Sequence, residues 1–246
     1  MSVTASDHEL ARQIAEAAGE ILLTLQKSGL FEGKALGKAG DQVANAFIIE
    51  ALKAQRPDDA ILSEEEKDNL DRCQASRVWV VDPLDGTREY SEKRTDWAVH
   101  IALAIDGEPA VGAVALPGLD LVLGADAPST LQPAADPLRM LVSRTRPAAE
   151  AVSVAEALGA ELVPMGSAGA KAMAVVRGEA DIYLHTGGQY EWDNCAPAAV
   201  ALAAGLHVSR IDGSPLVYNC EDPYLPDLLI CHKHHATQIL EMIGNA

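Results

Sequence analysis

An apolar run at residues 78–81 ends in two aspartates three positions apart, Asp82 and Asp85. Gly86 and Thr87 then turn the chain. A buried strand that delivers carboxylates into a polar loop makes an oxygen-rich cation site, of the kind that Mg²⁺ prefers. A glycine at this point lets backbone N–H groups approach a phosphate closely. The alternative is an ordinary Asp-Gly turn with an accidental second aspartate, and two further acidic motifs argue against it.

Two other acidic residues stand in comparable places. Glu64 follows a predicted strand at 60–62, and Asp193 precedes a predicted helix at 194–204. Each has an ordinary alternative, because Glu64 belongs to an acidic run at 64–68 and Asp193 could be a helix N-cap. Four carboxylates in one pocket would repel by about 4 kcal/mol per pair at 4 Å and an effective dielectric constant near 20. Only bound cations make such a cluster stable at neutral pH. If the four carboxylates lie in one pocket, they therefore form a cation site and not an acidic run and a helix N-cap.

The net charge of −17 over 246 residues limits the partners. A field of this sign repels nucleic acids and anionic membranes. No window approaches the roughly 18 apolar residues of a membrane span, and the N-terminus lacks a secretory pattern. We therefore expect a cytoplasmic protein with no nucleic-acid or membrane partner, whose four cysteines are reduced thiols. If the substrate is a phosphate ester, cations and local basic residues must reverse the field at the site.

The spacing of apolar residues predicts two helices near the N-terminus. The first runs from residue 6 to 26 and is opened by a capping box of Ser6 and Glu9. The second covers about 41–55, after a Gly- and Lys-containing loop at 29–40. Both predictions rest on apolar residues recurring three and four positions apart.

Short apolar runs and then alternating elements follow. The runs predict an antiparallel meander at 98–105, 110–116 and 119–124. The second half predicts strands at 140–142, 161–163, 181–184 and 228–231, and helices at 148–158, 168–176, 194–204 and about 235–243. This order predicts an α/β (α+β) fold of stacked layers. We expect a single domain, 1–246, with subregions 1–127 and 138–246.

Three sequence blocks resemble the signatures of the inositol monophosphatase superfamily, in the same order and at approximately the same spacing. They are Leu62-Ser63-Glu64-Glu65, Trp79-Val80-Val81-Asp82-Pro83-Leu84-Asp85-Gly86-Thr87 and Glu191-Trp192-Asp193-Asn194-Cys195-Ala196-Pro197. Segments 166–171 and 178–183 extend the resemblance to nearly the whole chain. Within the superfamily the chain most resembles the bacterial 3′(2′),5′-bisphosphate nucleotidases, which act on 3′-phosphoadenosine 5′-phosphate in sulfate assimilation. The resemblance implies a layered α-β-α-β-α sandwich and a phosphoric monoester hydrolase.

The resemblance also implies a cofactor, two or three Mg²⁺ ions per site, and inhibition by Li⁺ competing at a Mg²⁺ position. Glu64, Asp82 and the Leu84 carbonyl would hold the first ion. Asp82, Asp85 and Asp193 would hold the second, so that Asp82 bridges both.

Catalysis is implied in the same way. The N–H groups of Gly86 and Thr87 would bind the scissile phosphate at a helix start. Thr87, hydrogen-bonded to Asp41, would help Glu64 to position and deprotonate the attacking water. Two metal ions about 4 Å apart can generate hydroxide on one side and stabilise the leaving oxygen on the other. The expected mechanism is therefore in-line attack by a metal-activated water, without a Ser, Cys or His nucleophile.

Two features favour a nucleotidase within the superfamily. Inositol-selective members usually carry a Glu six residues before the Trp of the third block, where this chain has Thr186. The form Glu191-Trp192-Asp193 is common among bisphosphate nucleotidases instead. Ser167, Lys171 and Arg144 resemble the hydroxyl and basic residues of the same group. These three and Asp193, with Gly86 and Thr87, are the predicted substrate contacts.

The helix predicted at 168–176, with Ser167 as its N-cap, would direct N–H groups and a positive dipole end at a second phosphate. The alternative for Lys171 is an ordinary exposed helix lysine. One segment departs from the family, since many members have Val-Thr just before the position of Asp41. This chain reads Leu-Gly-Lys-Ala-Gly-Asp over 36–41, which leaves the pocket wall there open.

Other functions stay open on the sequence alone. Inositol 1-phosphate, sugar 1-phosphates and fructose 1,6-bisphosphate are alternative substrates. A non-catalytic sensor that binds a nucleotide phosphate is an alternative of another class, although a binder has no need of the complete acidic set. We also expect a homodimer. His100, His185 and His207 fit no zinc motif and are expected to be core or surface residues.

Overall fold

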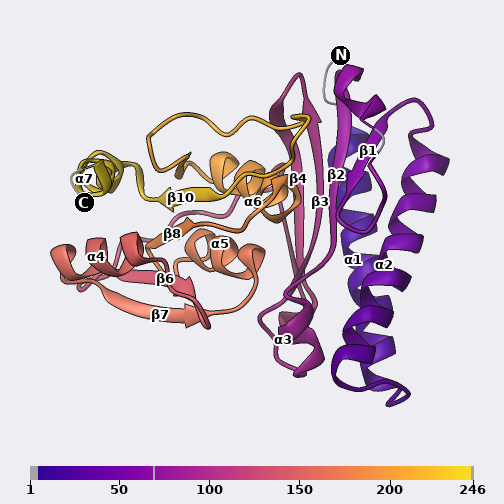
Figure 1. The fold of residues 1–246 in the computed structure, drawn as a ribbon, viewed down its shortest axis with the longest axis horizontal. Coiled ribbons are helices and arrows are strands. Elements are labelled where there is room, and N and C mark those ends of the chain that lie inside the picture. The colour runs from indigo at the N-terminus through magenta and orange to yellow at the C-terminus, as the bar shows by residue number, and fades with distance from the viewer. Residues whose placement is uncertain (1–4, 69, 245–246) are drawn as a thin grey trace.

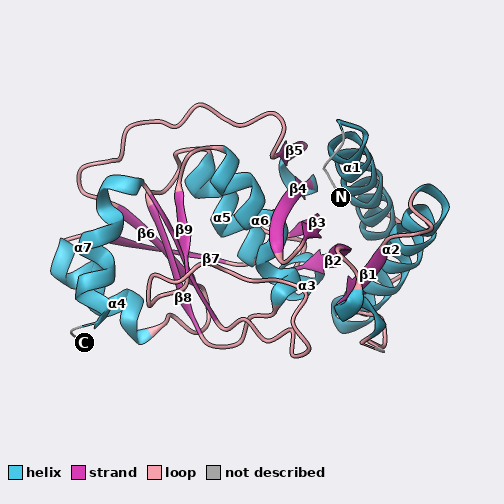
Figure 2. Ribbon diagram, turned by 90° about the horizontal axis from the view of Figure 1, so that it is seen from above, coloured by secondary structure: helices cyan, strands magenta, loops and turns pink. Residues whose placement is uncertain are grey.

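The computed structural model describes residues 5–68 and 70–244 and arranges them in five layers (Figure 1). Helices α1 and α2 form the first layer and pack on a five-stranded sheet. Helices α5 and α6 lie between this sheet and a second one, whose far face is covered by α4 and α7 (Figure 2). The predicted α-β-α-β-α sandwich is confirmed. The helices are α1 (Ala5–Lys27), α2 (Gly33–Gln55), α3 (Thr87–Ser91), α4 (Ala149–Leu158), α5 (Ala168–Val176), α6 (Glu191–Ala203) and α7 (Lys233–Gly244), with short 3-10 helices η1 (Asp71–Gln74) and η2 (Pro117–Leu119).

The first five strands along the chain form one sheet, and the last five form the other. The first has the strand order β1-β2-β3-β4-β5, with β1 and β2 parallel and the other pairs antiparallel. The second has the order β7-β6-β8-β10-β9, in which β7, β6 and β8 are parallel. The strands are β1 (Ala60–Ser63), β2 (Arg77–Asp85), β3 (Ala98–Ile105), β4 (Glu108–Leu116), β5 (Leu121–Gly124), β6 (Arg139–Ser143), β7 (Glu161–Met165), β8 (Ile182–Thr186), β9 (His207–Ser209) and β10 (Asp227–Cys231). The predicted meander is confirmed, and the predicted subregions correspond to one sheet each; their behaviour as a single domain stays a prediction.

Strand β2 shows why the first sheet is central. Successive side chains of a strand point to opposite faces, so a strand covered on both sides is apolar throughout. Val78 and Val80 pack into the core around α5 and α6, whereas Trp79 and Val81 pack against α1 and α2. The first sheet therefore has a hydrophobic core on each face, and packing on both faces holds β2 in place.

The predicted loop at 29–40 is largely wrong, because α2 already begins at Gly33. Gly29 and Gly33 have positive φ values before and at the start of α2, whereas Gly37 and Gly40 serve packing inside the helix. A Cβ atom at Gly37 would lie 2.7 Å from Thr87 Cγ2, and one at Gly40 would lie 2.9 Å from Tyr90 Cε1. The absence of side chains lets α2 approach α3 and the end of β2 closely, which brings Asp41 toward Thr87.

Two helix starts also differ from the prediction. Helix α1 begins at Ala5, so Ser6 lies inside its first turn and does not cap it; the Ser6 hydroxyl accepts a hydrogen bond from Arg56 instead. Helix α6 begins at Glu191, three residues before the predicted start, so Asp193 is its third residue. Within the described ranges, no helix combines the length and hydropathy needed to cross a lipid bilayer. All four cysteines are free thiols.

The contact between β4 and α6 gives a stability prediction. A Cβ atom at Gly112 would lie 2.6 Å from the Ala196 carbonyl oxygen and 2.7 Å from Ala199 Cβ. Gly112→Ala therefore forces α6 away from the sheet, and we expect a loss of about 1–3 kcal/mol in the free energy of unfolding. Urea unfolding measures it. Gly244→Ala, with nothing within 4 Å of the added atom, is the control. Equal unfolding midpoints for the two variants would show that the contact is not tight.

Candidate active site

Parallel pairing of β1 and β2 brings the first two acidic motifs together. The carboxyl ends of parallel strands meet at one edge of a sheet, and Glu64 follows β1 there, its N–H donating to the Val81 carbonyl at 3.3 Å. Residues 82–85 belong to β2 and not to a loop as predicted, but the register with β3 shifts between Asp82 and Asp85. Residues three apart in a regular strand would face opposite sides, so the shift allows both carboxylates to face one pocket.

Helix α6 supplies the third motif from the other half of the chain. The carboxylate of Asp193 accepts a hydrogen bond from the Tyr190 N–H at 2.7 Å, which fixes the side chain at the start of the helix. One carboxylate oxygen each of Asp82, Asp85 and Asp193 lies within 4.8 Å of the others. Glu64 lies close enough to Asp193, Asp82 and Asp85 for these groups to shift its pKa. The four predicted carboxylates thus converge.

The crowding raises the pKa values of three of these groups. Burial, and then the charge of Asp193, raise the pKa of Glu64 to about 7. Burial and the charge of Asp85 raise the pKa of Asp193 to about 7. For Asp82, burial and the charges of Glu64 and Asp85 raise the pKa well above its ordinary value. The protein alone therefore disfavours the fully ionised cluster, and divalent cations are the charges that would complete it.

Asp85 is the exception, because the protein supplies its donors. The Ser167 hydroxyl donates to its carboxylate at 2.5 Å, as do the N–H groups of Ala168 at 3.2 Å and Gly169 at 2.7 Å. Burial would raise the pKa of Asp85, but His100 and Ser167 with the Gly169 N–H lower it to about 2. The start of α5 thus faces Asp85. The expectation that its N–H groups face a second phosphate is wrong for these two groups, since a buried carboxylate already uses them.

His100 was expected only as a core or surface residue, and it is fully buried. It lies opposite Asp82 in the β2–β3 register, with Nε2 at 3.2 Å from Asp85 Oδ2 and Nδ1 at 3.0 Å from the Trp192 carbonyl oxygen. Burial would lower the pKa of His100, but the contact with Asp85 raises it. The sequence signal was a single polar residue within an otherwise apolar strand.

Thr87 and Asp41 meet at the beginning of α3. The Thr87 hydroxyl lies 3.3 Å from Asp41 Oδ1 and 3.2 Å from the Leu84 carbonyl oxygen. Burial and the charge of Glu65 raise the pKa of Asp41 to about 7. Gly86 caps α3 with a φ of +85°, and a Cβ atom there would lie 3.1 Å from Ser167 Cβ. A glycine is therefore needed between the carboxylate strand and the helix start.

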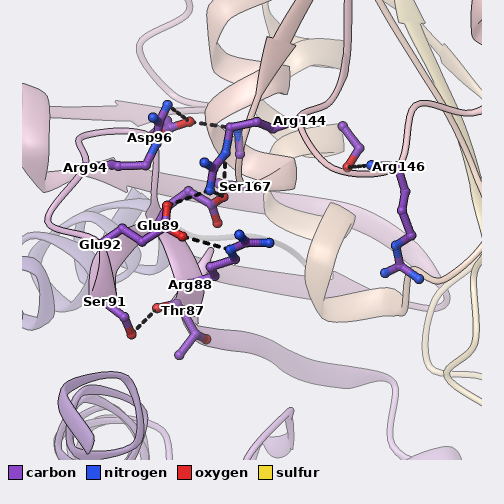
Figure 3. Close-up of polar contacts among 12 residues, drawn as sticks. Thr87, Arg88, Glu89, Ser91, Glu92, Arg94, Asp96, Arg144, Arg146 and Ser167 are labelled. Carbon is purple, nitrogen blue, oxygen red and sulfur yellow. Dashed lines mark hydrogen bonds and ion pairs between the residues drawn. The ribbon is translucent and has the colours of Figure 1, made fainter. Parts of the chain in front are cut away.

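The two predicted basic contacts already have partners in the chain. Arg144 bonds Glu89 at 2.7 Å and Glu92 at 2.8 Å, both on or beside α3 (Figure 3). Lys171 is buried and not an exposed helix lysine; its Nζ atom donates to the Ser167 carbonyl at 2.6 Å. Burial lowers the pKa of Lys171, and the charges of Asp85 and neighbouring carboxylates oppose that effect. Contacts of Arg144, Ser167 and Lys171 with a substrate stay predictions.

Comparison with known proteins places this site in a family. The model of the inositol monophosphatase family matches residues 2–244. The chain is 49% identical to the 3′-phosphoadenosine 5′-phosphate phosphatase of Mycobacterium leprae, over 97% of this chain and 93% of that protein. It is 50% identical to the protein of the same name from Mycobacterium tuberculosis, over 93% and 90%. The 3′(2′),5′-bisphosphate nucleotidase CysQ of Escherichia coli is 32% identical, over 76% and 81%.

Solved structures share the fold. CysQ from Bacteroides thetaiotaomicron aligns with a TM-score of 0.78 at 26% identity, over 93% of this chain and 97% of that one. Inositol monophosphatase II from Staphylococcus aureus aligns with a TM-score of 0.81 at 20% identity, over 97% and 95%, and supports the fold alone. From the match of the family model and the close relatives along nearly its whole length, this chain belongs to the inositol monophosphatase family.

Proposed function

We propose that this protein is a Mg²⁺-dependent phosphatase that removes the 3′-phosphate of 3′-phosphoadenosine 5′-phosphate. The relatives at about half identity carry that activity in their names. The observation that carries the proposal is the convergence of three buried or half-buried carboxylates, Asp82, Asp85 and Asp193, within 4.8 Å. A protein gains nothing in stability from such a cluster without cations.

The donor set fits Mg²⁺. Every donor in the proposed set is a carboxylate or carbonyl oxygen, the ligand type that hard cations take. The raised pKa values of Glu64, Asp82 and Asp193 mark groups that lack a counter-charge. We propose that Glu64, Asp82 and the Leu84 carbonyl hold one ion, and that Asp82, Asp85 and Asp193 hold another. When bound, the ions would make water a stronger nucleophile and offset the charge that develops on the leaving oxygen.

The chain's own residues would do the rest of the chemistry. Glu64 would act as the general base that accepts a proton from the attacking water. The Thr87 hydroxyl has one proton and two lone pairs, so it can donate to Asp41 while accepting a hydrogen bond from that water. The N–H groups of Gly86 and Thr87 would hold the scissile phosphate at the start of α3. Thr87 and Asp41 thereby position the water for in-line attack.

A substrate panel tests the proposal. Phosphate release is measured from 3′-phosphoadenosine 5′-phosphate, inositol 1-phosphate and fructose 1,6-bisphosphate, and the substrates are ranked by kcat/KM. The highest value is expected for the first. A higher value for either of the others overturns the substrate assignment, and binding without release from any of them would favour a sensor. Assembly as a homodimer and a cytoplasmic location stay predictions.

The shared position of Asp82 gives a mutational prediction. Asp82→Asn removes a charge that both ions would share, so we expect loss of both Mg²⁺ affinity and turnover. Thr87→Ala removes only a positioning hydroxyl and should lower kcat by about 10²-fold or more, with the Mg²⁺ dependence unchanged. Thr87→Ser should keep most of the activity. A mere rise in the Mg²⁺ requirement for both Asp82→Asn and Thr87→Ala would contradict the role given to Thr87.

The raised pKa values predict how stability depends on pH. In the folded protein without Mg²⁺, the pKa values of Glu64 and Asp193 are about 7, against 4.5 and 3.8 ordinarily. Their neutral forms favour the folded state, so this stabilisation is complete below the ordinary values and is lost as pH rises through about 7. The Tm gain from saturating Mg²⁺ should therefore be larger at about pH 8 than at about pH 5.5. Thermal unfolding at matched ionic strength measures it, and a pH-independent gain speaks against the cluster as the Mg²⁺ site.

A further inference from the structure

The ring of His100 contacts both elements that carry Asp85 and Asp193, the two carboxylates assigned to the second ion alone. His100 belongs to β3 and is fully buried. Its Nε2 atom lies 3.2 Å from Asp85 Oδ2, and its Nδ1 atom lies 3.0 Å from the carbonyl oxygen of Trp192, the residue before Asp193. The ring therefore connects the end of β2 to the start of α6, which come from different halves of the chain.

The first sheet and α5 fix the position of this ring. His100 pairs with Asp82 of β2, and residues that pair directly in a sheet lie on the same face. The register shift between Asp82 and Asp85 allows the Asp85 carboxylate to meet the ring on that face. On the other side, Gly169 of α5 leaves room for the ring, because a Cβ atom there would lie 2.0 Å from Nε2. The ring is thus packed against β2, α5 and α6 in one orientation.

The contacts of Asp85 differ between its two oxygens. Oδ2 accepts hydrogen bonds from the Ser167 hydroxyl at 2.5 Å and the Gly169 N–H at 2.7 Å, and it also faces His100. Within residues 5–68 and 70–244, Oδ1 accepts one hydrogen bond, from the Ala168 N–H at 3.2 Å. His100 is therefore one of three groups that hold Oδ2 and leave Oδ1 as the oxygen available to a cation.

The second contact of His100 acts on Asp193. A carbonyl oxygen only accepts, so Nδ1 of His100 donates to the peptide group that joins Trp192 to Asp193. The carboxylate of Asp193 is held separately, by the Tyr190 N–H at 2.7 Å. Because His100 contacts Asp85 directly and Asp193 through its peptide group, the separation of the two carboxylates depends on this ring.

We propose that His100 is a positioning residue for metal binding, which sets the separation of Asp85 and Asp193 and thereby the affinity of the second cation site. This inference rests on the proposed function and its metal ligands. The other seven residues of β3 are apolar, and a buried polar ring among them is costly unless its nitrogens have partners. Groups that orient metal ligands from outside typically change metal affinity by 10–100-fold when they are replaced.

Metal binding without substrate tests this role. Mn²⁺, which takes the same oxygen ligands as Mg²⁺, is titrated into the protein and followed by calorimetry. His100→Leu should lower the affinity for one of the two ions by about 10–100-fold and leave the other nearly unchanged. The Gln amide reaches about as far as Nε2 and the Asn amide about as far as Nδ1, so His100→Gln should recover more affinity than His100→Asn. His207→Leu is the control, because its Nε2 contacts only Ser209 of β9 among the described residues, and it should leave both affinities unchanged.

Two further measurements separate positioning from general stability. Thermal unfolding without metal shows whether each variant is folded, and the comparison of His100→Gln with His100→Asn decides the question if His100→Leu is not. The Mg²⁺ concentration that gives half-maximal phosphate release should rise by the same factor as the Mn²⁺ affinity falls.

Three outcomes would overturn the proposal. The first is unchanged Mn²⁺ affinity in a folded His100→Leu variant. The second is an equal loss of affinity for both ions, which would make His100 a general packing residue. The third is greater recovery with Asn than with Gln. If the unmutated protein released no phosphate from 3′-phosphoadenosine 5′-phosphate, the proposed function would fail, while Mn²⁺ binding would still decide the role of His100.

Discussion

The hydrogen bonds to Asp85 join the two halves of this molecule. Its carboxylate lies at the end of β2 in the first sheet, and its donors are Ser167 and the first N–H groups of α5, which follow β7 of the second sheet. His100, on the neighbouring strand β3, closes the carboxylate from the other side. A Cβ atom at Gly169 would lie 2.0 Å from His100 Nε2, so only glycine allows this approach. The contacts of β2, β3 and the start of α5 with the buried Asp85 carboxylate therefore hold the acidic pocket together.

That arrangement divides the acidic cluster into two kinds of group. Asp85 is held ionised by the protein itself, with a pKa of about 2. Glu64 and Asp193 have pKa values near 7 because burial and mutual repulsion are not balanced by protein donors. One fixed charge beside several groups whose ionisation is disfavoured until a counter-charge is supplied is an arrangement that suits bound cations. Without bound cations this cluster lowers the stability of the folded protein, as functional clusters of buried like charges commonly do.

The cationic side chains around the pocket differ in the groups of the protein that they bond. Arg144 supports the position of α3 through Glu89 and Glu92, and Lys171 bonds the carbonyl that begins α5. Both residues thus stabilise the elements that carry Thr87 and the donors of Asp85. A residue type and a motif position can suggest a phosphate contact, but the charge is available to a ligand only if the chain leaves it unpaired.

Local patterns in the sequence determined the elements and the identities of the acidic residues. The apolar run before Asp82, the meander at 98–124 and the alternation after residue 138 follow from side-chain periodicity, which acts over a few residues. The helical segment at 33–40 was missed because glycine normally marks a loop, and its use here depends on Thr87 and Tyr90, distant in sequence. Tertiary structure alone decided which donors hold Asp85, that Lys171 is buried, and that Arg144 has carboxylate partners. These outcomes depend on distances between elements far apart in the chain, which no local pattern contains.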